Sequence, residues 1–171
     1  MNLRDRLRGD DGPELHRYQM REKLMSIGDD AWIENEAGDR VFKVNGKAAR
    51  VRDTFIIEGP DGAQLAKIQE RKVSVRDKMA IECGDTTASV HKALIGLRDR
   101  YTIDVDGGPD LKAHGNFVDH EYEIEQDGDT IATISKKWFR VRDSYGIEIT
   151  PGQNDALLIA VTVCVDEMSD D

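Results

Sequence analysis

Apolar and polar residues alternate along most of the chain with a period of two, which is typical of β-strands with one buried face. One eight-residue pattern, an apolar residue and an Arg-Asp pair followed by an alternating run, occurs four times: Val51–Glu58, Val75–Glu82, Leu97–Asp104 and Val141–Glu148. A glycine stands thirteen residues before the start of each copy. Because glycines and Arg-Asp pairs both favour turns, each copy predicts a strand, a tight turn and a second strand.

Two weaker copies, Ile27–Glu34 and Val118–Glu125, complete a series of six units between about residues 15 and 150. Two turns per unit predict antiparallel strands joined in sequence, about twelve in all. In the first strand of a unit, the apolar parity changes between Ala66–Ile68 and Val73–Val75, which predicts a β-bulge there. An open sheet of this size would expose two edges, so a closed antiparallel barrel is expected.

A barrel of twelve strands is wider than the eight-stranded barrels that their own side chains fill. The segment 155–165 is apolar on every side, follows Pro151-Gly152, and has possible N-caps at Asn154 and Asp155. We therefore predict a helix at about residues 154–167 inside the barrel. The β-propensity of Val161–Val165 would also allow a thirteenth strand, but a segment that is apolar all round has to be surrounded. We expect a flexible charged segment at 1–14 and one domain at 15–171.

The composition restricts the possible partners and the compartment. A net charge of −10 and only 6% aromatic residues oppose binding to nucleic acid. The charged N-terminal residues predict no signal peptide, and the longest apolar run is too short for a membrane helix. The two cysteines lie in apolar runs, as expected of core residues in a reducing compartment. These features predict a cytoplasmic protein, and the excess of Asp over Glu is compatible with a salt-rich cytoplasm.

Several short motifs stand out along the chain: Glu22–Leu24, Gly28–Asp30, Val41–Ala48, Arg52–Phe55, Lys136–Trp138, Asp143–Tyr145 and Asp155–Ala160. Together they resemble motifs of the LURP-one-related family, which belongs to the tubby-like C-terminal superfamily. The resemblance implies a twelve-stranded barrel with a C-terminal helix threaded through its centre, in agreement with the repeat pattern. It implies little chemistry, although superfamily relatives include tubby proteins, which bind phosphoinositides on a basic surface, and scramblase-like membrane proteins.

No catalytic signature occurs in the sequence. It contains no phosphate-binding glycine loop, nucleophile elbow or Cys-x-x-Cys pair. His114 and His120 are close enough in sequence to suggest a metal site, but strand histidines on either side of a bend are more often surface residues. We therefore predict a protein that is not an enzyme and has no catalytic residues, cofactor or metal.

Two clusters of basic residues, one at 67–78 and one at 136–142, are the features that suggest a function. The candidate anion-binding residues are Arg71, Lys72, Arg76, Lys136, Lys137 and Arg142. On an acidic protein such clusters can hold a phosphate; alternatively, they only pair with surface carboxylates. The sequence favours a binding or adaptor module, possible partners being a protein, a small anion or a lipid headgroup. The alternatives are a structural or regulatory protein acting through protein contacts alone, and an enzyme with a scattered site.

Overall fold

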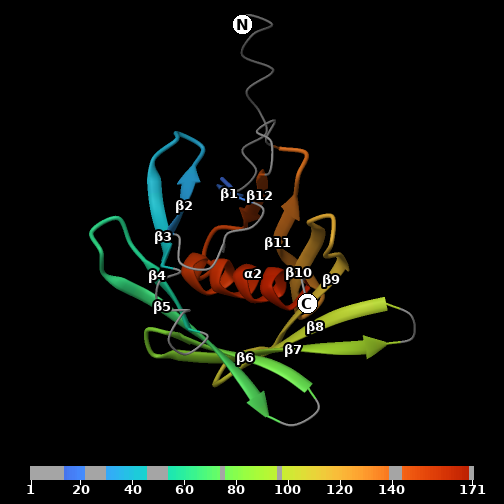
Figure 1. Cartoon of the computed structure of the whole chain (residues 1–171). Coiled ribbons are helices and arrows are strands. Elements are labelled where there is room, and N and C mark those ends of the chain that lie inside the picture. The colour runs from blue at the N-terminus through green and yellow to red at the C-terminus, as the bar shows by residue number, and fades with distance from the viewer. Residues whose placement is uncertain are drawn as a thin grey trace, which may run out of the picture.

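The computed structural model describes residues 14–21, 30–45, 54–73, 76–95, 98–138 and 144–169. These ranges contain twelve strands and one helix (Figure 1). The strands are β1 (His16–Arg21), β2 (Asp30–Asn35), β3 (Arg40–Asn45), β4 (Thr54–Glu58), β5 (Gln64–Val73), β6 (Arg76–Cys83), β7 (Thr86–Ile95), β8 (Arg98–Val105), β9 (Leu111–Asn116), β10 (Glu121–Gln126), β11 (Asp129–Ser135) and β12 (Ser144–Ile149). The helix is α2 (Asp155–Ser169).

The strands form a closed antiparallel barrel, as the alternating pattern predicts. Each strand pairs with the next one in the chain, and β1 pairs with β12 to close the ring. The closing ladder runs from His16 opposite Ile149 to Arg21 opposite Ser144. Closure gives every strand two hydrogen-bonded neighbours and removes the exposed edges of an open sheet.

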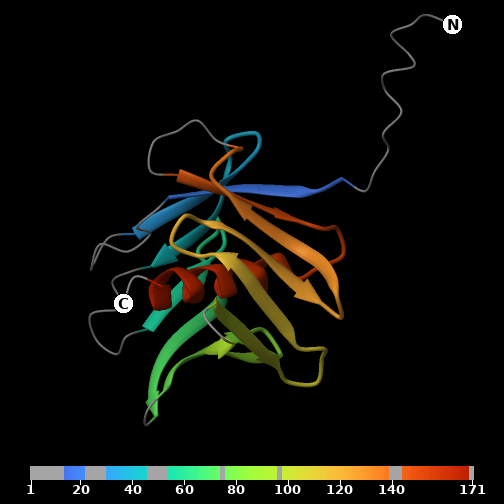
Figure 2. The ribbon, with the colours of Figure 1, turned by 90° about the vertical axis from the view of Figure 1, so that its right-hand side faces the viewer.

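The helix α2 occupies the centre of the barrel (Figures 1 and 2). Every side chain from Leu157 to Val165 is buried, so the predicted helix inside the barrel is confirmed and the alternative of a thirteenth strand is wrong. The Asn154 side chain caps the helix by accepting a hydrogen bond from the Leu157 N–H at 3.2 Å. Thr162, the polar residue within this apolar run, donates its hydroxyl to the Leu158 carbonyl at 2.9 Å and so is not left unsatisfied.

The inward-facing side chains of the wall pack around α2. They include Ile57, Ile68, Ile81, Ile103 and Ile147, one from each of five strands. None of these five side chains is more than 1% exposed. The residues between them face outward. The two faces of the wall therefore have different roles: the inner face belongs to the core, and only the outer face and the rims can meet a partner.

Bulges occur in the wall, but not where the change of apolar parity predicts them. The β5–β6 ladder continues without a shift from Lys67 to Val73. Register shifts instead follow the hairpin turns of β2–β3, β4–β5 and β10–β11, where Val41, Leu65 and Ile131 are the extra residues. Each lies three residues after a turn glycine (Gly38, Gly62 or Gly128) whose φ is between 82° and 86°. The parity change thus does not mark a bulge within β5, because this strand stays paired to its end.

Two Arg-Asp pairs are strand residues, not the turns that the sequence pattern predicts. Arg76-Asp77 begins β6, where Arg76 lies opposite Val73, and Arg98-Asp99 begins β8, where Arg98 lies opposite Ile95. The long ladders leave only residues 74–75 and 96–97 to connect the strands. The Arg-Asp pairs at 52–53 and 142–143 lie outside the described residues, as does all of the predicted flexible segment 1–14 except Glu14.

Candidate functional site

A row of basic side chains crosses the outer face of five neighbouring strands. Arg71 of β5 lies opposite Lys78 of β6, Lys78 opposite His91 of β7, His91 opposite Thr102 of β8, and Thr102 opposite Lys112 of β9. Neighbouring strands are about 4.8 Å apart, so the row extends over roughly 19 Å. The register of the sheet therefore joins residues that are up to 41 positions apart in sequence (112 − 71).

Arg100 adds a further charge beside this row. It is exposed on β8 and lies opposite Ala93 on one side and His114 on the other. We call the set Arg71, Lys78, His91, Arg100 and Lys112 the basic face. Its members point outward because alternate residues of the same strands, such as Met79, Val90 and Ile103, are buried in the core.

Most cations of the basic face have no carboxylate partner among the residues that the structure describes. Within the described part of the chain, none of Arg71, Lys78, Arg100 and Lys112 forms an ion pair, and His91 Nδ1 lies 3.6 Å from Asp104 Oδ2. Lys112 lies directly opposite Glu125, but the Glu125 carboxylate is 2.7 Å from His114 Nε2. The basic face is therefore a local region of positive potential on a chain with a net charge of −10.

Two cations elsewhere on the wall, Arg17 and Lys43, are paired with carboxylates. Arg17 Nε lies 2.6 Å from Glu148, and Arg17 Nη1 lies 3.2 Å from Glu36. Lys43 Nζ lies 3.1 Å from Asp30, and the hydrogen bond to that carboxylate raises the pKa of Lys43. Surface ion pairs thus form at Arg17 and Lys43, whereas among the described residues Arg71, Lys78, Arg100 and Lys112 form none.

The first predicted cluster, Arg71, Lys72 and Arg76, lies at one end of the basic face. Arg71 is exposed and belongs to that face. In the backbone ladder Lys72 lies opposite Asp77, and Arg76 opposite Val73. The side chains of Lys72 and Arg76 lie outside the described residues.

The second predicted cluster is on a different part of the wall. Lys136 and Lys137 follow β11, which is six places from β5 in the ring of twelve strands. Lys136 is half-buried and its backbone N–H donates to Glu121 Oε1 at 3.1 Å, whereas Lys137 is exposed. Arg142 lies outside the described residues. The structure therefore does not join the two predicted clusters into one surface.

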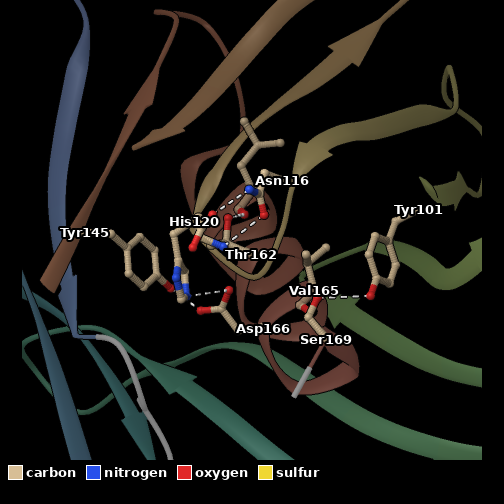
Figure 3. A network of polar contacts seen from close by, with 10 residues as sticks. Tyr101, Asn116, His120, Tyr145, Thr162, Val165, Asp166 and Ser169 are labelled. Atoms are coloured by element: carbon tan, nitrogen blue, oxygen red, sulfur yellow. Dashed lines mark hydrogen bonds and ion pairs between the residues drawn. The ribbon is translucent and has the colours of Figure 1, made fainter. Parts of the chain in front are cut away.

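A separate polar network ties the C-terminal end of α2 to the inside of the wall (Figure 3). The Tyr145 hydroxyl donates to the Asp166 carboxylate, and His120 Nε2 lies 3.5 Å from Asp166 Oδ1. The His120 ring stacks on Tyr145 with the centroids 4.3 Å apart. The side chains of His120 and Asp166 are each only 14% exposed. This enclosed network holds the helix in place and is poorly suited to meet a substrate.

The N-terminal end of α2 is held in a similar way. Asp155 Oδ2 accepts a hydrogen bond from the Tyr18 hydroxyl at 2.5 Å and lies 2.7 Å from His16 Nδ1. Burial, together with the hydrogen bond to the Asp155 carboxylate, raises the pKa of Tyr18. Each end of the helix thus has an aspartate that contacts a tyrosine and a histidine of the wall.

Comparison with known proteins agrees with this architecture. The model of the family described as LURP-one-related matches residues 16–166, a range that includes all twelve strands and most of α2. The chain belongs to the LURP-one-related family. A crystal structure of a protein from Arabidopsis thaliana has a similar fold, with a TM-score of 0.61 and 12% sequence identity over 92% of this chain and 93% of that chain. No curated protein matches the chain in sequence.

The side chains of this LURP-one-related protein must be interpreted on their own, because a likeness at 12% identity shows the fold alone. Sequence reasoning selected Arg71 but not Lys78, His91, Arg100 or Lys112 as parts of one surface. Lys78 stands in the same basic stretch of sequence as Arg71, whereas the other three belong to the sequences of three later strands. Only the strand register brings those three together with Arg71, so no local signal could have identified them.

One group in the LURP-one-related barrel has the chemistry to hold a metal ion. The side chains of His114, Glu123 and Glu125 converge on the outer face of β9 and β10, with their ligand atoms within 4.8 Å of one another. The histidine pair suggested by sequence spacing is not brought together: His114 contacts Glu125, whereas His120 contacts Asp166.

No helix in the described ranges is long and apolar enough to cross a membrane.

Proposed function

We propose that this protein is a non-catalytic binding module whose basic face holds a phosphate-bearing ligand. The observation that supports the proposal most directly is the row Arg71, Lys78, His91 and Lys112, in which three cations form no ion pair in the described part of the chain. Arginine and lysine are the side chains that proteins use for phosphate, through the forked guanidinium and the compact ammonium charge. The shared chemistry fits a phosphorylated lipid headgroup or a soluble phosphorylated molecule.

The dimensions of the basic face favour a ligand with several negative charges. A single phosphate cannot contact both ends of a row that is roughly 19 Å long. At physiological salt the Debye length is about 8 Å, so a distant charge contributes little and a ligand gains most from charges spread along the row. Each cation near an anionic membrane surface contributes about 1 kcal/mol.

We keep both predicted clusters as candidate anion-binding sites, and we favour one of them. Arg71, together with Lys72 and Arg76 of the same hairpin, extends the basic face at the β5–β6 end. Lys136, Lys137 and Arg142 form a second proposed anion-binding group, on another part of the barrel. We favour the basic face, because Glu121 lies beside Lys136 and lowers the positive potential there.

A binding titration of the full chain tests the proposal. The probes are vesicles of phosphatidylcholine with and without a phosphatidylinositol bisphosphate, and free inositol hexakisphosphate. The variant Lys78→Glu/Lys112→Glu should weaken binding at least 25-fold, since each lost cation contributes about 1 kcal/mol, roughly fivefold. The variant Lys136→Glu/Lys137→Glu makes the same change in charge within the second proposed group. It should bind like the wild type if the basic face holds the ligand, and a selective loss of binding in this variant would assign the ligand to the second group instead.

The outcomes separate the possible functions. Binding to the lipid vesicles alone would assign a headgroup on a membrane, and binding to inositol hexakisphosphate alone would assign a soluble phosphorylated ligand. Binding to both would show that the basic face recognises phosphate groups without needing the membrane. Raising the salt concentration should weaken either interaction. Equal binding by both double variants, or binding that is insensitive to salt, would contradict the proposal. In that case the alternatives are a protein that acts through protein contacts alone and an enzyme with a scattered site.

The proposed location is the cytoplasm. The buried free thiols of Cys83 and Cys164 suit a reducing compartment. If that cytoplasm is rich in salt, screening would weaken the basic face and protein contacts would be the better hypothesis.

A further inference from the structure

Three potential metal ligands meet on the outer surface of the β9–β10 hairpin. His114 of β9 lies directly opposite Glu123 of β10, and Glu125 lies two residues further along β10 on the same face. Both glutamates face outward because Tyr122 and Ile124 beside them are buried in the core. This is the one group of three or more potential ligands among the residues that the structure describes.

We infer that His114, Glu123 and Glu125 bind a divalent transition-metal ion, for which Zn²⁺ is the best match. Zinc takes imidazole nitrogen at about 2.0–2.1 Å and carboxylate oxygen at about 2.0–2.2 Å. In a tetrahedral site such bonds separate the ligand atoms by roughly 3.4 Å. Here His114 Nε2 and Glu125 Oε1 are 2.7 Å apart, and all three ligand atoms lie within 4.8 Å. Small rotations of the side chains would therefore complete the coordination, and a water molecule would take the fourth position.

The charges of the three groups also suit a divalent cation. Two carboxylates that converge within 4.8 Å repel each other, and imidazole binds a metal in its neutral form, which does not compensate their charge. A divalent ion would balance the two carboxylates. The Thr130 hydroxyl, which donates to Glu123 Oε2 at 3.4 Å, would help to orient that carboxylate.

Two cations of the basic face stand next to this group. Arg100 lies opposite His114 and Lys112 opposite Glu125, but neither forms an ion pair in the described part of the chain. Their charges lower the affinity for a cation without competing for its ligands. Because metal binding displaces protons from its ligands, affinity should also decrease at acid pH.

Isothermal titration of the full chain with zinc chloride, in a buffer that does not bind metals, tests this inference. The wild type should bind one ion per chain. Each of three variants, His114→Ala, Glu123→Gln and Glu125→Gln, should reduce the affinity for zinc about 10-fold or more. Even changes to residues that only hydrogen-bond to metal ligands typically reduce metal affinity by about 10-fold or more. Visible absorption with Co²⁺ provides a second measurement, since a tetrahedral site gives intense bands that hexahydrated Co²⁺ lacks.

His16→Ala is the matched control. His16 is also a histidine with its ring nitrogen 2.7 Å from a carboxylate oxygen, but that carboxylate, Asp155, is a single one. If any histidine beside a carboxylate captured zinc, this variant would lose as much binding as His114→Ala. Loss in the three ligand variants with retention in His16→Ala would support the site. Equal loss in both histidine variants, unchanged binding by His114→Ala, or no saturable binding by the wild type would overturn the inference. Circular dichroism verifies that each variant is folded, and the isosteric Glu→Gln changes test the site should His114→Ala be unstable.

Discussion

The central position of α2 predicts a large loss of stability when its packing is disturbed. Leu158 is in the first turns of the helix and is only 2% exposed. Its backbone also takes part in the helix, since its N–H donates to the Asn154 carbonyl at 3.1 Å. Because the surrounding wall is closed by hydrogen bonds, it can collapse only partly into a cavity left by a shortened side chain. We therefore expect Leu158→Ala to lower the free energy of unfolding by as much as other large-to-small substitutions in rigid cores do.

Such changes cost about 2–5 kcal/mol. In a domain of this size each kcal/mol lowers the melting temperature by about 2–4 °C, so a loss of about 3 kcal/mol should appear as a decrease of about 6–12 °C. In urea the midpoint should decrease by about 1–3 M. Leu158→Asp should not fold, because an unpaired charge in this position is not compensated and the total stability of a domain is only about 5–15 kcal/mol.

Thermal and urea unfolding, followed by circular dichroism, measure these effects. The matched control is Val118→Ala, which shortens a side chain that is 76% exposed and should change stability by no more than about 0.5 kcal/mol. The model of a helix that fills the barrel would be refuted by a soluble Leu158→Asp variant with a native spectrum and cooperative unfolding. Equal effects of Leu158→Ala and Val118→Ala would also contradict it.

Two further predictions concern the ends of the helix and the titration of buried tyrosines. Asn154→Ala removes the side chain that caps α2 and should lower the free energy of unfolding by about 1 kcal/mol, or the melting temperature by about 2–4 °C. Asn154→Asp keeps a capping oxygen and should leave the stability nearly unchanged. Equal losses of stability in the two variants would argue against capping. Burial and a nearby aspartate raise the pKa values of Tyr18 and Tyr122, so the folded state holds their protons more tightly than the unfolded state, whose tyrosines titrate near pH 10. Stability should therefore be fully retained below about pH 10 and decrease as the pH rises further, with phenolate absorbance from these two residues appearing together with the loss of circular dichroism. Ionisation of all four tyrosines in a protein that keeps its native spectrum would contradict this prediction.

The barrel and its helix could be predicted because each depends on a local pattern. A strand such as β4, with Phe55 and Ile57 buried and Ile56 between them half-buried, shows its period of two in five residues. The segment Leu157–Val165 is apolar at every position except Thr162, and a surrounded helix satisfies both that composition and the backbone hydrogen bonds. The family match over residues 16–166 supports the same fold.

The ends of the strands could not be predicted in this way. The sequence predicts a turn at Arg76-Asp77, because aspartate commonly adopts turn conformations. In the structure the pair belongs to β6, since the ladder extends to Val73 opposite Arg76. Turn propensity is a property of one or two residues, whereas the length of a hairpin depends on pairing along both strands. The same reason explains the misplaced bulge in β5.

The interior network was also beyond sequence reasoning. His120, Tyr145 and Asp166 lie in a turn, a strand and the helix, and nothing in their spacing indicates that they meet. His120 additionally has a φ of 53°, which an alternating pattern does not reveal. Contacts of this kind depend on how the helix is positioned inside the closed wall, which the spacing of residues along the chain does not reveal.

The geometry of the wall explains why a binding surface here is distributed over many strands. In an antiparallel barrel of hairpins, residues about twenty positions apart in sequence return to the same height on alternate strands, as Arg71, His91 and Lys112 do. A ligand on the outer face would therefore contact several strands through one side chain each. The core constrains the inward positions, because each must pack against α2, but it does not constrain the outward ones. Outward positions such as Lys78 and Lys112 can thus carry binding chemistry with little effect on stability, and for this reason the double charge reversal tests binding separately from folding.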